Sequence, residues 1–281
     1  MKYLITSLFF LVSIVQAEQF QAPITDTQWL VTESPLKCSM HQDITRFGGA
    51  EFSQIPGGEF NLTFTTALYP SQKTDIYFEI AQAPWQNSED RLMLVAIPVE
   101  KNQQTFTITG KIAKQAFTYI KEGMFPTIRY QSQNSMEEIS VLLSTVHFRD
   151  SHIAFTQCVE QLTPYTFEQM QKLTVYFNSE ESVLHSEAKQ ALTRLADYVK
   201  IDDSIRRITV SGHTDNHGRK RLNIPLSAAR SLAVKVFLIN ECDLDEAMIT
   251  TSFHREFVAT TSNKTGSGRT QNRRAEIELI R

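Results

Sequence analysis

A carboxylate and a guanidinium in the C-terminal half of the chain are the side chains best placed for binding chemistry. Asp215 stands in a polar loop, residues 212–222, and Arg230 falls on the second turn of the helix predicted to follow. Main-chain N–H groups at a helix N-terminus attract anions, and an arginine can bind a carboxylate through two parallel hydrogen bonds. The pattern predicts a site for a ligand that carries both an ammonium and a carboxylate. The alternative is that Asp215 and Arg230 pair with each other.

Two other chemistries use residue types found in the same loop, and the sequence favours neither. His213, Asp215 and His217 have a spacing that could ligate zinc, but a solvated loop position explains His217 equally well. Ser211, His213 and Asp215 supply the residue types of a hydrolase, yet neighbours at one strand end do not converge beside an oxyanion hole. We therefore expect no metal, no cofactor and no catalytic residue.

The elements that must position this loop follow from the spacing of apolar residues. Strands are predicted at 173–177, 205–211, 249–253 and 275–279. Helices are predicted from Ser186 to about Lys200 and from Asn223 to about Asn240. Their inward faces are expected to carry Ala188, Leu192, Leu195 and Val199 in the first, and Leu226, Ala229, Ala233, Val236 and Phe237 in the second. The order is β-α-β-α-β-β, with each crossover helix covering a sheet face.

Three separated motifs in this half resemble the OmpA-like peptidoglycan-binding domain over residues 173–281. They read Gly-His-Thr-Asp-Asn-x-Gly from Gly212, Leu-Asn-x-x-Leu-Ser-x-x-Arg from Leu222, and Asn-Arg-Arg-x-Glu-Ile from Asn272. The resemblance implies the same β-α-β-α-β-β fold and non-covalent binding of the diaminopimelate residue in the peptide of the cell wall. By position, the resemblance implies that Asp215 and Arg230 bind the amino-acid end of that residue and that Thr214 supports the Asp215 loop. The residues implied at the border of the site are Asn223, Arg273 and Arg274.

The chain departs from that family's pattern at three places around the expected site. Asn178 stands after the first strand, where many members have a carboxylate, so we expect weaker attraction for an ammonium. Residues 252–257 replace the usual glycine-rich segment after the third strand, and residues 241–243 replace the usual glycine before it. The basin is expected to persist with an altered rim.

The N-terminal half has a different pattern, in which short apolar strands alternate with polar residues. Phe60, Leu62 and Phe64 interleave with polar side chains, and several Pro-, Gly- and Asn-containing turns separate such runs. One short helix is predicted at 113–119. The sequence thus predicts an α+β protein of two domains. An all-β domain at 18–157, either an antiparallel sheet or a barrel-like sandwich, is followed by a linker at 158–171 and the OmpA-like domain at 172–281. No catalytic motif is visible in the first domain.

The first 17 residues have the features of a secretory signal peptide. Lys2 precedes an apolar run, and Val15-Gln16-Ala17 fits a small-x-small cleavage site. The run is shorter than the roughly 20 residues that span a bilayer, and no later stretch is expected to span one. We expect cleavage after Ala17 and a periplasmic product. In that oxidising compartment the placement of the three cysteines favours a Cys38–Cys158 disulfide with Cys242 unpaired.

The whole layout is similar to that of the MotY family of sodium-driven polar flagellar motors. That resemblance implies a ring, the T ring, around the flagellar basal body, with the N-terminal domain docked on the basal body and on a MotX-like partner. The C-terminal domain would tie the ring to peptidoglycan and help to hold the stator complex. A general periplasmic envelope tether is the alternative, and a wall-modifying enzyme is less favoured. The net charge of −3 gives no basic field for nucleic acid.

Overall fold

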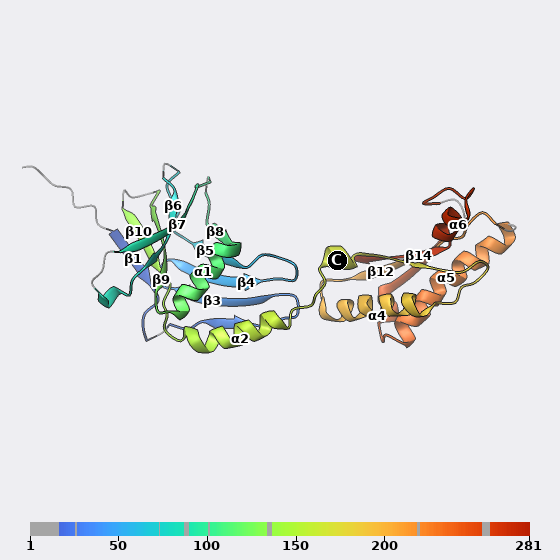
Figure 1. Cartoon of the computed structure of the whole chain (residues 1–281), viewed down its shortest axis with the longest axis horizontal. Helices are drawn as coiled ribbons and strands as arrows, with labels where there is room; N and C mark the ends of the chain where they lie inside the picture. Colours follow the sequence, from blue (N-terminus) through green and yellow to red (C-terminus); the bar gives the residue numbers. More distant parts are fainter. Residues whose placement is uncertain are drawn as a thin grey trace, which may run out of the picture. The chain divides into compact units, whose positions relative to one another are not determined.

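The chain folds into two compact units, Met1–Leu162 and Thr163–Arg281 (Figure 1). The computed structural model describes residues 17–25, 27–72, 74–86, 90–100, 102–133, 137–217, 220–254 and 259–281. The predicted signal peptide therefore lies outside the described residues apart from its last position, and its cleavage stays a prediction. The linker is shorter than predicted, because Cys158–Glu160 complete helix α2 and Phe167–Met170 form helix α3.

The N-terminal unit contains two five-stranded sheets, in the orders β1-β10-β9-β6-β7 and β2-β3-β4-β5-β8. All pairs are antiparallel except β1 with β10. The strands are β1 (Ala17–Gln21), β2 (Leu30–Thr32), β3 (Cys38–Ile44), β4 (Gly48–Gln54), β5 (Asn61–Thr66), β6 (Ile76–Ala81), β7 (Arg91–Ile97), β8 (Thr105–Thr109), β9 (Phe125–Gln131) and β10 (Glu138–Leu142). The helical elements are η1 (Pro84–Gln86), α1 (Gly110–Lys121) and α2 (Phe148–Glu160). The predicted β-rich fold is confirmed, while α2 was not predicted.

Alternation along these strands fills one core shared by both sheets. Phe64 of β5 and Phe78 of β6 are fully buried and in ring contact, with centroids 6.3 Å apart. The favoured disulfide is present: Cys38 on β3 is bonded to Cys158 on α2, and Cys242 is a buried free thiol. Because the bridge closes a loop of 120 residues, the chain-entropy model assigns it about 4–5 kcal/mol of stabilisation.

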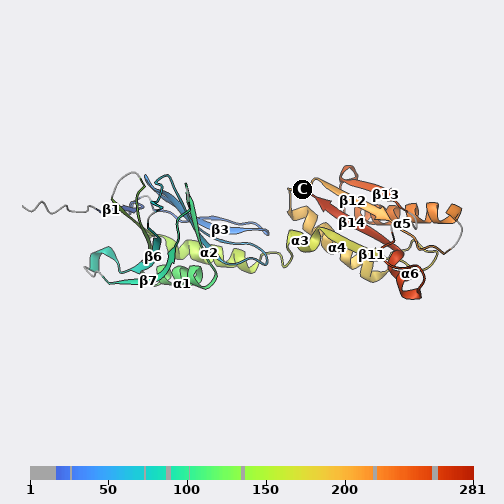
Figure 2. The ribbon, with the colours of Figure 1, turned by 90° about the horizontal axis from the view of Figure 1, so that it is seen from above.

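The C-terminal unit is one four-stranded sheet with helices packed against it (Figure 2). The strand order is β11-β14-β12-β13, and only β12 and β13 run parallel. The elements are α3 (Phe167–Met170), β11 (Lys172–Tyr176), α4 (Ser186–Ile201), β12 (Arg207–Gly212), α5 (Lys220–Asn240), η2 (Glu246–Met248), β13 (Ile249–Phe253), α6 (Gly266–Asn272) and β14 (Arg274–Ile280). Helix α4 contacts β11, and α5 contacts β12 and β13. The predicted β-α-β-α-β-β order is confirmed, with α3 and α6 added.

Helix α5 buries a polar face, which corrects the predicted inward positions. Asn223, Ser227, Arg230 and Ser231 are buried together with Val234 and Leu238, whereas Val236 is 44% exposed. The reason is close backbone contact: a Cβ on Gly212 of β12 would overlap the carbonyl oxygen of Ser227. The backbone of α5 therefore lies directly against β12 at Gly212, and the two helix residues at that contact, Ser227 and Ser231, have small side chains.

The same helix is long and apolar enough to resemble a membrane-spanning segment. By length and hydropathy alone, Arg221–Asn240 could cross a membrane, contrary to the expectation that no later stretch could. In the structure this segment packs on β12 and β13, with Val234 and Leu238 fully buried. A core helix of a globular domain passes the same test of composition.

Candidate functional site

A cavity of about 440 Å³ lies at the start of α5, beside the loop that follows β12. Its lining joins the β12–α5 loop, the first turns of α5, the segment after β11 and the residue before β14. The lining residues are Ser179, Glu180, Asp215, His217, Leu222, Asn223, Pro225, Leu226, Ala229, Arg230 and Arg273. Four of the seven residues predicted for the site are therefore brought together: Asp215, Asn223, Arg230 and Arg273.

Arg230 is fully buried at the back of this cavity and is held by main-chain carbonyl groups. Its Nε donates to Glu181 O at 2.9 Å, Nη1 to His213 O at 2.8 Å and Nη2 to Asn178 O at 3.0 Å. The guanidinium also lies 5.2 Å from the ring centre of Phe177. Burial lowers the pKa of Arg230 to about 10, with Arg273 acting in the same direction and Asp215 opposing it. The side chain is thus charged at neutral pH, although no carboxylate among the described residues is paired with it.

Asp215 finds its ion partner in Arg273 rather than in Arg230. Asp215 Oδ2 accepts from Arg273 Nη1 at 3.1 Å, and Oδ1 accepts from the main-chain N–H of His217 at 3.1 Å. Asn223 Nδ2 donates to the main-chain oxygen of Asp215 at 3.2 Å. Within the described part of the chain, the direct Asp215–Arg230 pair considered from the sequence is not formed.

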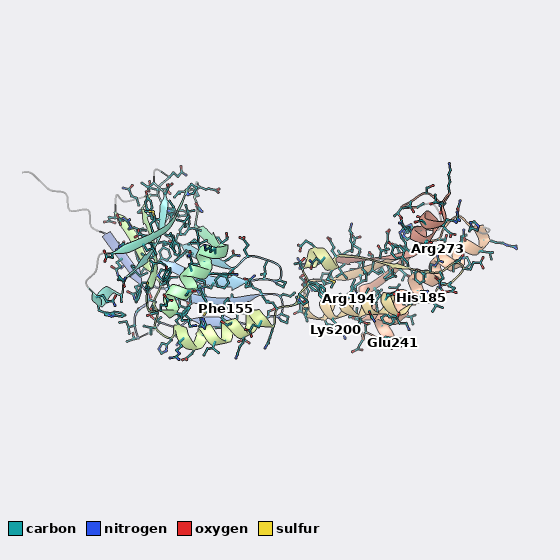
Figure 3. All side chains as sticks on the ribbon, viewed as in Figure 1. Phe155, His185, Arg194, Lys200, Glu241 and Arg273 are labelled. Carbon is teal, nitrogen blue, oxygen red and sulfur yellow. A yellow bond between two sulfur atoms is a disulfide. The ribbon has the colours of Figure 1, made fainter. Side chains whose placement is uncertain are left out.

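Arg273 connects this loop to two other elements, as its position beside α6 suggests (Figure 3). Besides Asp215, it donates from Nε to Phe177 O at 3.2 Å and from Nη2 to Thr270 Oγ1 at 2.9 Å. Arg273 therefore joins segments that are distant in sequence: Asp215 is 58 residues away from it and Phe177 is 96 residues away.

Two further residues predicted for the site, one at its border and one supporting the loop, do not line the cavity. Arg274 is buried elsewhere, with Nε donating to Glu276 Oε1 at 2.7 Å. Consecutive residues entering a strand point to opposite faces, so Arg273 and Arg274 cannot both face the cavity. Thr214 is also buried and lines no described cavity wall, although it belongs to the loop that carries Asp215.

Asn178 contributes its backbone, and a carboxylate two residues later lines the cavity. The Asn178 carbonyl binds Arg230, while its side-chain Nδ2 donates to Glu181 Oε2 at 3.0 Å. Glu180 has a positive φ of 60°, an unusual conformation for a residue other than glycine, and lines the cavity. The sequence comparison considered only position 178 and so missed Glu180. The paired acidic residues at 180–181 were the available signal.

The outer wall of the cavity is aliphatic, which sequence reasoning also missed. Leu222, Pro225, Leu226 and Ala229 line it, on the side of α5 next to the buried polar positions Asn223 and Arg230. The charged side chains of the lining are Glu180, Asp215, Arg230 and Arg273. Two positive and two negative groups beside an aliphatic wall suit a flexible amphipathic zwitterion.

The zinc and hydrolase hypotheses gain no support from the neighbouring side chains. No cluster of three potential metal ligands occurs among the described residues. His213 is instead buried and stacked on His254 with ring centres 5.3 Å apart, and burial lowers its pKa to about 4. Ser211 Oγ lies 2.8 Å from Ser252 Oγ, in a contact with another serine.

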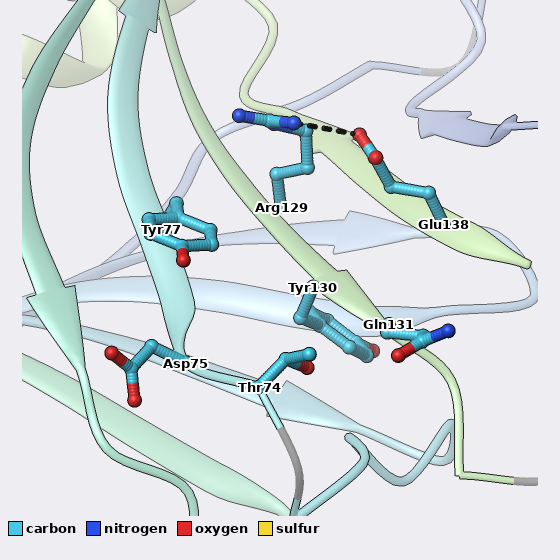
Figure 4. A pocket seen from close by; sticks show the side chains of 7 residues that line it. All are labelled: Thr74, Asp75, Tyr77, Arg129, Tyr130, Gln131 and Glu138. Carbon is cyan, nitrogen blue, oxygen red and sulfur yellow. Dashed lines mark hydrogen bonds and ion pairs between the residues drawn. The ribbon is translucent and has the colours of Figure 1, made fainter. Parts of the chain in front are cut away.

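A second cavity, of about 320 Å³, lies in the N-terminal unit (Figure 4). It is lined by Thr74, Asp75, Tyr77, Arg129, Tyr130, Gln131 and Glu138. Arg129 is held by two carboxylates: Nε lies 2.7 Å from Glu79 Oε1 and Nη1 lies 3.1 Å from Glu138 Oε1. Burial alone lowers the pKa of Arg129, but hydrogen bonds to Glu79 and Glu138 outweigh it, so the pKa is raised.

Comparison with known proteins divides the chain as the structure does. A family model described as MotY N-terminal domain matches residues 20–164, and the OmpA family matches residues 176–273. The sodium-type flagellar protein MotY of Vibrio parahaemolyticus is 27% identical over 271 residues, which cover 95% of this chain and 92% of that protein. Outer membrane protein A of Bordetella avium is 33% identical over 105 residues, or 37% of this chain and 53% of that protein.

Two of the solved structures that are similar to the chain each cover 39% of it. The C-terminal domain of Helicobacter pylori MotB is 20% identical, covers 39% of this chain and 84% of its own, and has a TM-score of 0.36. The cell wall anchor of the T6SS from Pseudomonas aeruginosa is 26% identical, with coverages of 39% and 80% and a TM-score of 0.34. Since the MotY N-terminal model matches more than half of the 281 residues and an OmpA domain follows it, the chain belongs to the MotY family.

Proposed function

We propose that this chain is a periplasmic structural component of the sodium-driven flagellar motor that tethers the motor to peptidoglycan. The relative of nearly full coverage is named a sodium-type flagellar protein, and the OmpA family match supports a wall-binding C-terminal unit. The N-terminal unit docks on the flagellar basal body and on a MotX-like partner. Copies associate in the T ring and help to hold the stator complex. No catalytic group is needed for this role.

The observation that carries the wall-binding half is the environment of Arg230. Three of its five N–H donors bind carbonyl oxygens, which fix the guanidinium and leave two donors for a ligand carboxylate. A carboxylate entering the cavity would supply the anionic partner that Arg230 lacks among the described residues. Such charge-assisted bonds contribute about 1.5–3 kcal/mol each when the pair is desolvated.

Asp215 and Glu180 are proposed to receive the ammonium of the same ligand. Asp215 is only 6% exposed and is fixed by His217 N–H and Arg273, so its carboxylate is oriented before the ligand arrives. The diaminopimelate side chain ends in a carbon that bears both an ammonium and a carboxylate. Its methylene groups would lie against Leu222 and Leu226 on the aliphatic wall.

Weak wall contacts are sufficient if the chain acts in a ring. Linked copies bind one extended surface, so each further contact forms at a high effective concentration. Asn178 stands where many family members have a carboxylate, so we expect only moderate affinity at each site. Many such contacts acting together still give a stable attachment to the wall.

The decisive experiment for the site is sedimentation of the full chain with purified peptidoglycan. Asp215→Asn removes the ammonium acceptor with little change of volume and is expected to lower wall binding at least tenfold, about 1.4 kcal/mol or more. Asp203→Asn alters an exposed aspartate in the turn after α4 and is the matched control. Equal binding by Asp215→Asn and the control, with both proteins folded, would refute the site.

The motor assignment has a separate test that also addresses the alternative of a general envelope tether. Deletion of the gene is expected to leave flagellated cells that do not swim. Fragile envelopes with normal swimming would instead support the general tether. Release of soluble wall fragments by the purified protein would support the enzyme hypothesis over both.

A further inference from the structure

Strand β11 is an edge of the C-terminal sheet, and no strand among the described residues pairs with its outer main-chain groups. Its inner neighbour is β14: Leu279 N donates to Gln171 O at 2.9 Å, and Phe177 N donates to the oxygen of Arg273, the residue just before β14, at 2.8 Å. Antiparallel pairs alternate between bonded and non-bonded residues. The main-chain groups of Lys172, Thr174 and Tyr176 therefore point away from β14, towards the open edge. Such an edge is a template for another strand.

The helix beside this edge leaves room for a neighbour. Helix α4 lies alongside β11 (Figure 2), and two hollows of about 270 and 360 Å³ lie between them. Ala191 lines both hollows, Thr174 lines the first and Leu173 the second. The small side chain of Ala191 thus marks the middle of the groove, level with the middle of β11.

Two unpaired charges of opposite sign flank that midpoint. Glu187 lines the first hollow and Arg194 the second, and both side chains are exposed. Neither belongs to an ion pair among the described residues. Their spacing of seven residues is about two helical turns, which places both on one face of α4. Arg194 and His185 lie along this helix in Figure 3.

We propose that this edge is a two-fold interface between two copies of the chain. Strand β11 pairs antiparallel with β11 of the second copy, with Thr174 opposite Thr174 and Lys172 opposite Tyr176. The two four-stranded sheets become one sheet of eight strands. The α4 helices then run antiparallel across the same axis, where Ala191 permits close approach and Glu187 of each copy meets Arg194 of the other.

Charge complementarity selects a second copy over an unrelated strand. In an isologous contact, any group at one side of the axis faces its counterpart from the other side. Glu187 and Arg194, four residues before and three residues after Ala191, satisfy this condition for an axis that passes close to Ala191. The outward main-chain groups of β11 satisfy it about Thr174. A foreign strand would fill the edge but would leave Glu187 and Arg194 unpaired. The proposal does not depend on wall binding.

The first test places one cysteine on the proposed axis in the full-length mature chain. Antiparallel bonded pairs have Cα atoms about 5.5 Å apart, within the 4.4–6.8 Å that a disulfide spans. Thr174→Cys is expected to form a covalent dimer under mild oxidation at least tenfold faster than Thr251→Cys. Thr251 is an exposed threonine on β13, the opposite edge of the same sheet, and is the matched control. Equal rates for the two variants would overturn the proposal.

The second test exchanges the charges and is read by sedimentation equilibrium over a concentration series. Glu187→Arg or Arg194→Glu alone turns two attractions per dimer into repulsions and should weaken dimerisation about tenfold or more. The double variant restores both pairs with reversed polarity and should dimerise like the unaltered chain. A monomer at every concentration, or a double variant as weak as the single ones, would overturn the proposal. A dimer that none of these changes affects would form through another surface, and this result would also overturn the proposal.

Discussion

Each unit of the chain places an arginine beside a cavity, and the two guanidinium groups are compensated differently. In the N-terminal unit, Arg129 lies between the carboxylates of Glu79 and Glu138 at 2.7 and 3.1 Å. In the C-terminal unit, Arg230 is surrounded by three carbonyl oxygens, and the nearby Asp215 is paired with Arg273. The pKa of the first is raised by its carboxylates, whereas that of the second is lowered to about 10 by burial.

The contrast separates the ion-paired Arg129 from Arg230, the arginine that we propose binds a ligand carboxylate. Carboxylates cancel the charge of Arg129, so that cavity offers little to an anion. Carbonyl dipoles fix the geometry of the Arg230 guanidinium but do not neutralise its charge. A ligand carboxylate would therefore stabilise this buried charge. Whether a buried arginine can bind an anionic ligand is thus indicated better by the type of its hydrogen-bond acceptors than by its degree of burial.

Replacement of Arg230 should have the largest effect of any single change. Arg230→Met leaves three carbonyl oxygens without their donor, each costing about 1–3 kcal/mol, so we expect about 4 kcal/mol of destabilisation in the C-terminal unit. Wall binding should fall to background. Differential scanning calorimetry and peptidoglycan sedimentation measure the two effects. Arg207→Met, at an exposed arginine of β12, is the control. A variant that retains both stability and binding would remove the distinction drawn above.

Replacement of Arg129 should affect stability without affecting wall binding. Arg129→Met leaves Glu79, whose side chain is 3% exposed, with only Arg91 at 3.8 Å as an ion partner. We expect about 2–3 kcal/mol of destabilisation in the N-terminal unit, less than for a fully buried pair because Arg129 is partly exposed. Adding Glu79→Leu should recover most of it, since an apolar pair removes the stranded charge. Reduced wall sedimentation by a folded Arg129→Met protein would contradict this division of roles.

Acid should weaken the C-terminal unit through His213, whose carbonyl helps to hold Arg230. Burial lowers the pKa of His213 to about 4, and Arg274 acts in the same direction. Between that value and the ordinary 6.5, the unfolded chain binds one more proton than the folded chain, so stability falls as pH falls. This window of about 2.5 pH units corresponds to at most about 3.4 kcal/mol of folding stability. His213→Asn should flatten this part of the stability–pH curve, and His185→Asn, at an exposed histidine, should not.

Much of this arrangement followed from sequence patterns, and the failures have physical causes. Apolar periodicity gave the order of strands and helices, and three motifs brought Asp215 and Arg230 to one cavity. Periodicity misplaced the buried face of α5, because that face holds polar side chains such as Ser227 and Arg230, which a search for apolar residues passes over. It could not show that Asp215 binds Arg273, 58 residues away. Adjacent motif residues were treated as one group, although strand alternation separates Arg273 from Arg274.

The smallest predicted effect concerns the carboxylate that sequence comparison overlooked. Glu180 lines the cavity while its neighbour Glu181 is bonded to the Asn178 side chain outside it, so the two form a matched pair. If Glu180 helps to receive the ammonium, Glu180→Gln should weaken wall binding about three- to fivefold, roughly 0.6–1 kcal/mol for a partly exposed ion pair. Glu181→Gln keeps a hydrogen-bonding side chain and should leave binding unchanged. The loss should shrink as salt is raised, because an exposed pair is screened. Equal binding by both variants at low salt would assign the ammonium to Asp215 alone, and the C-terminal cavity would then offer one carboxylate against two guanidinium groups.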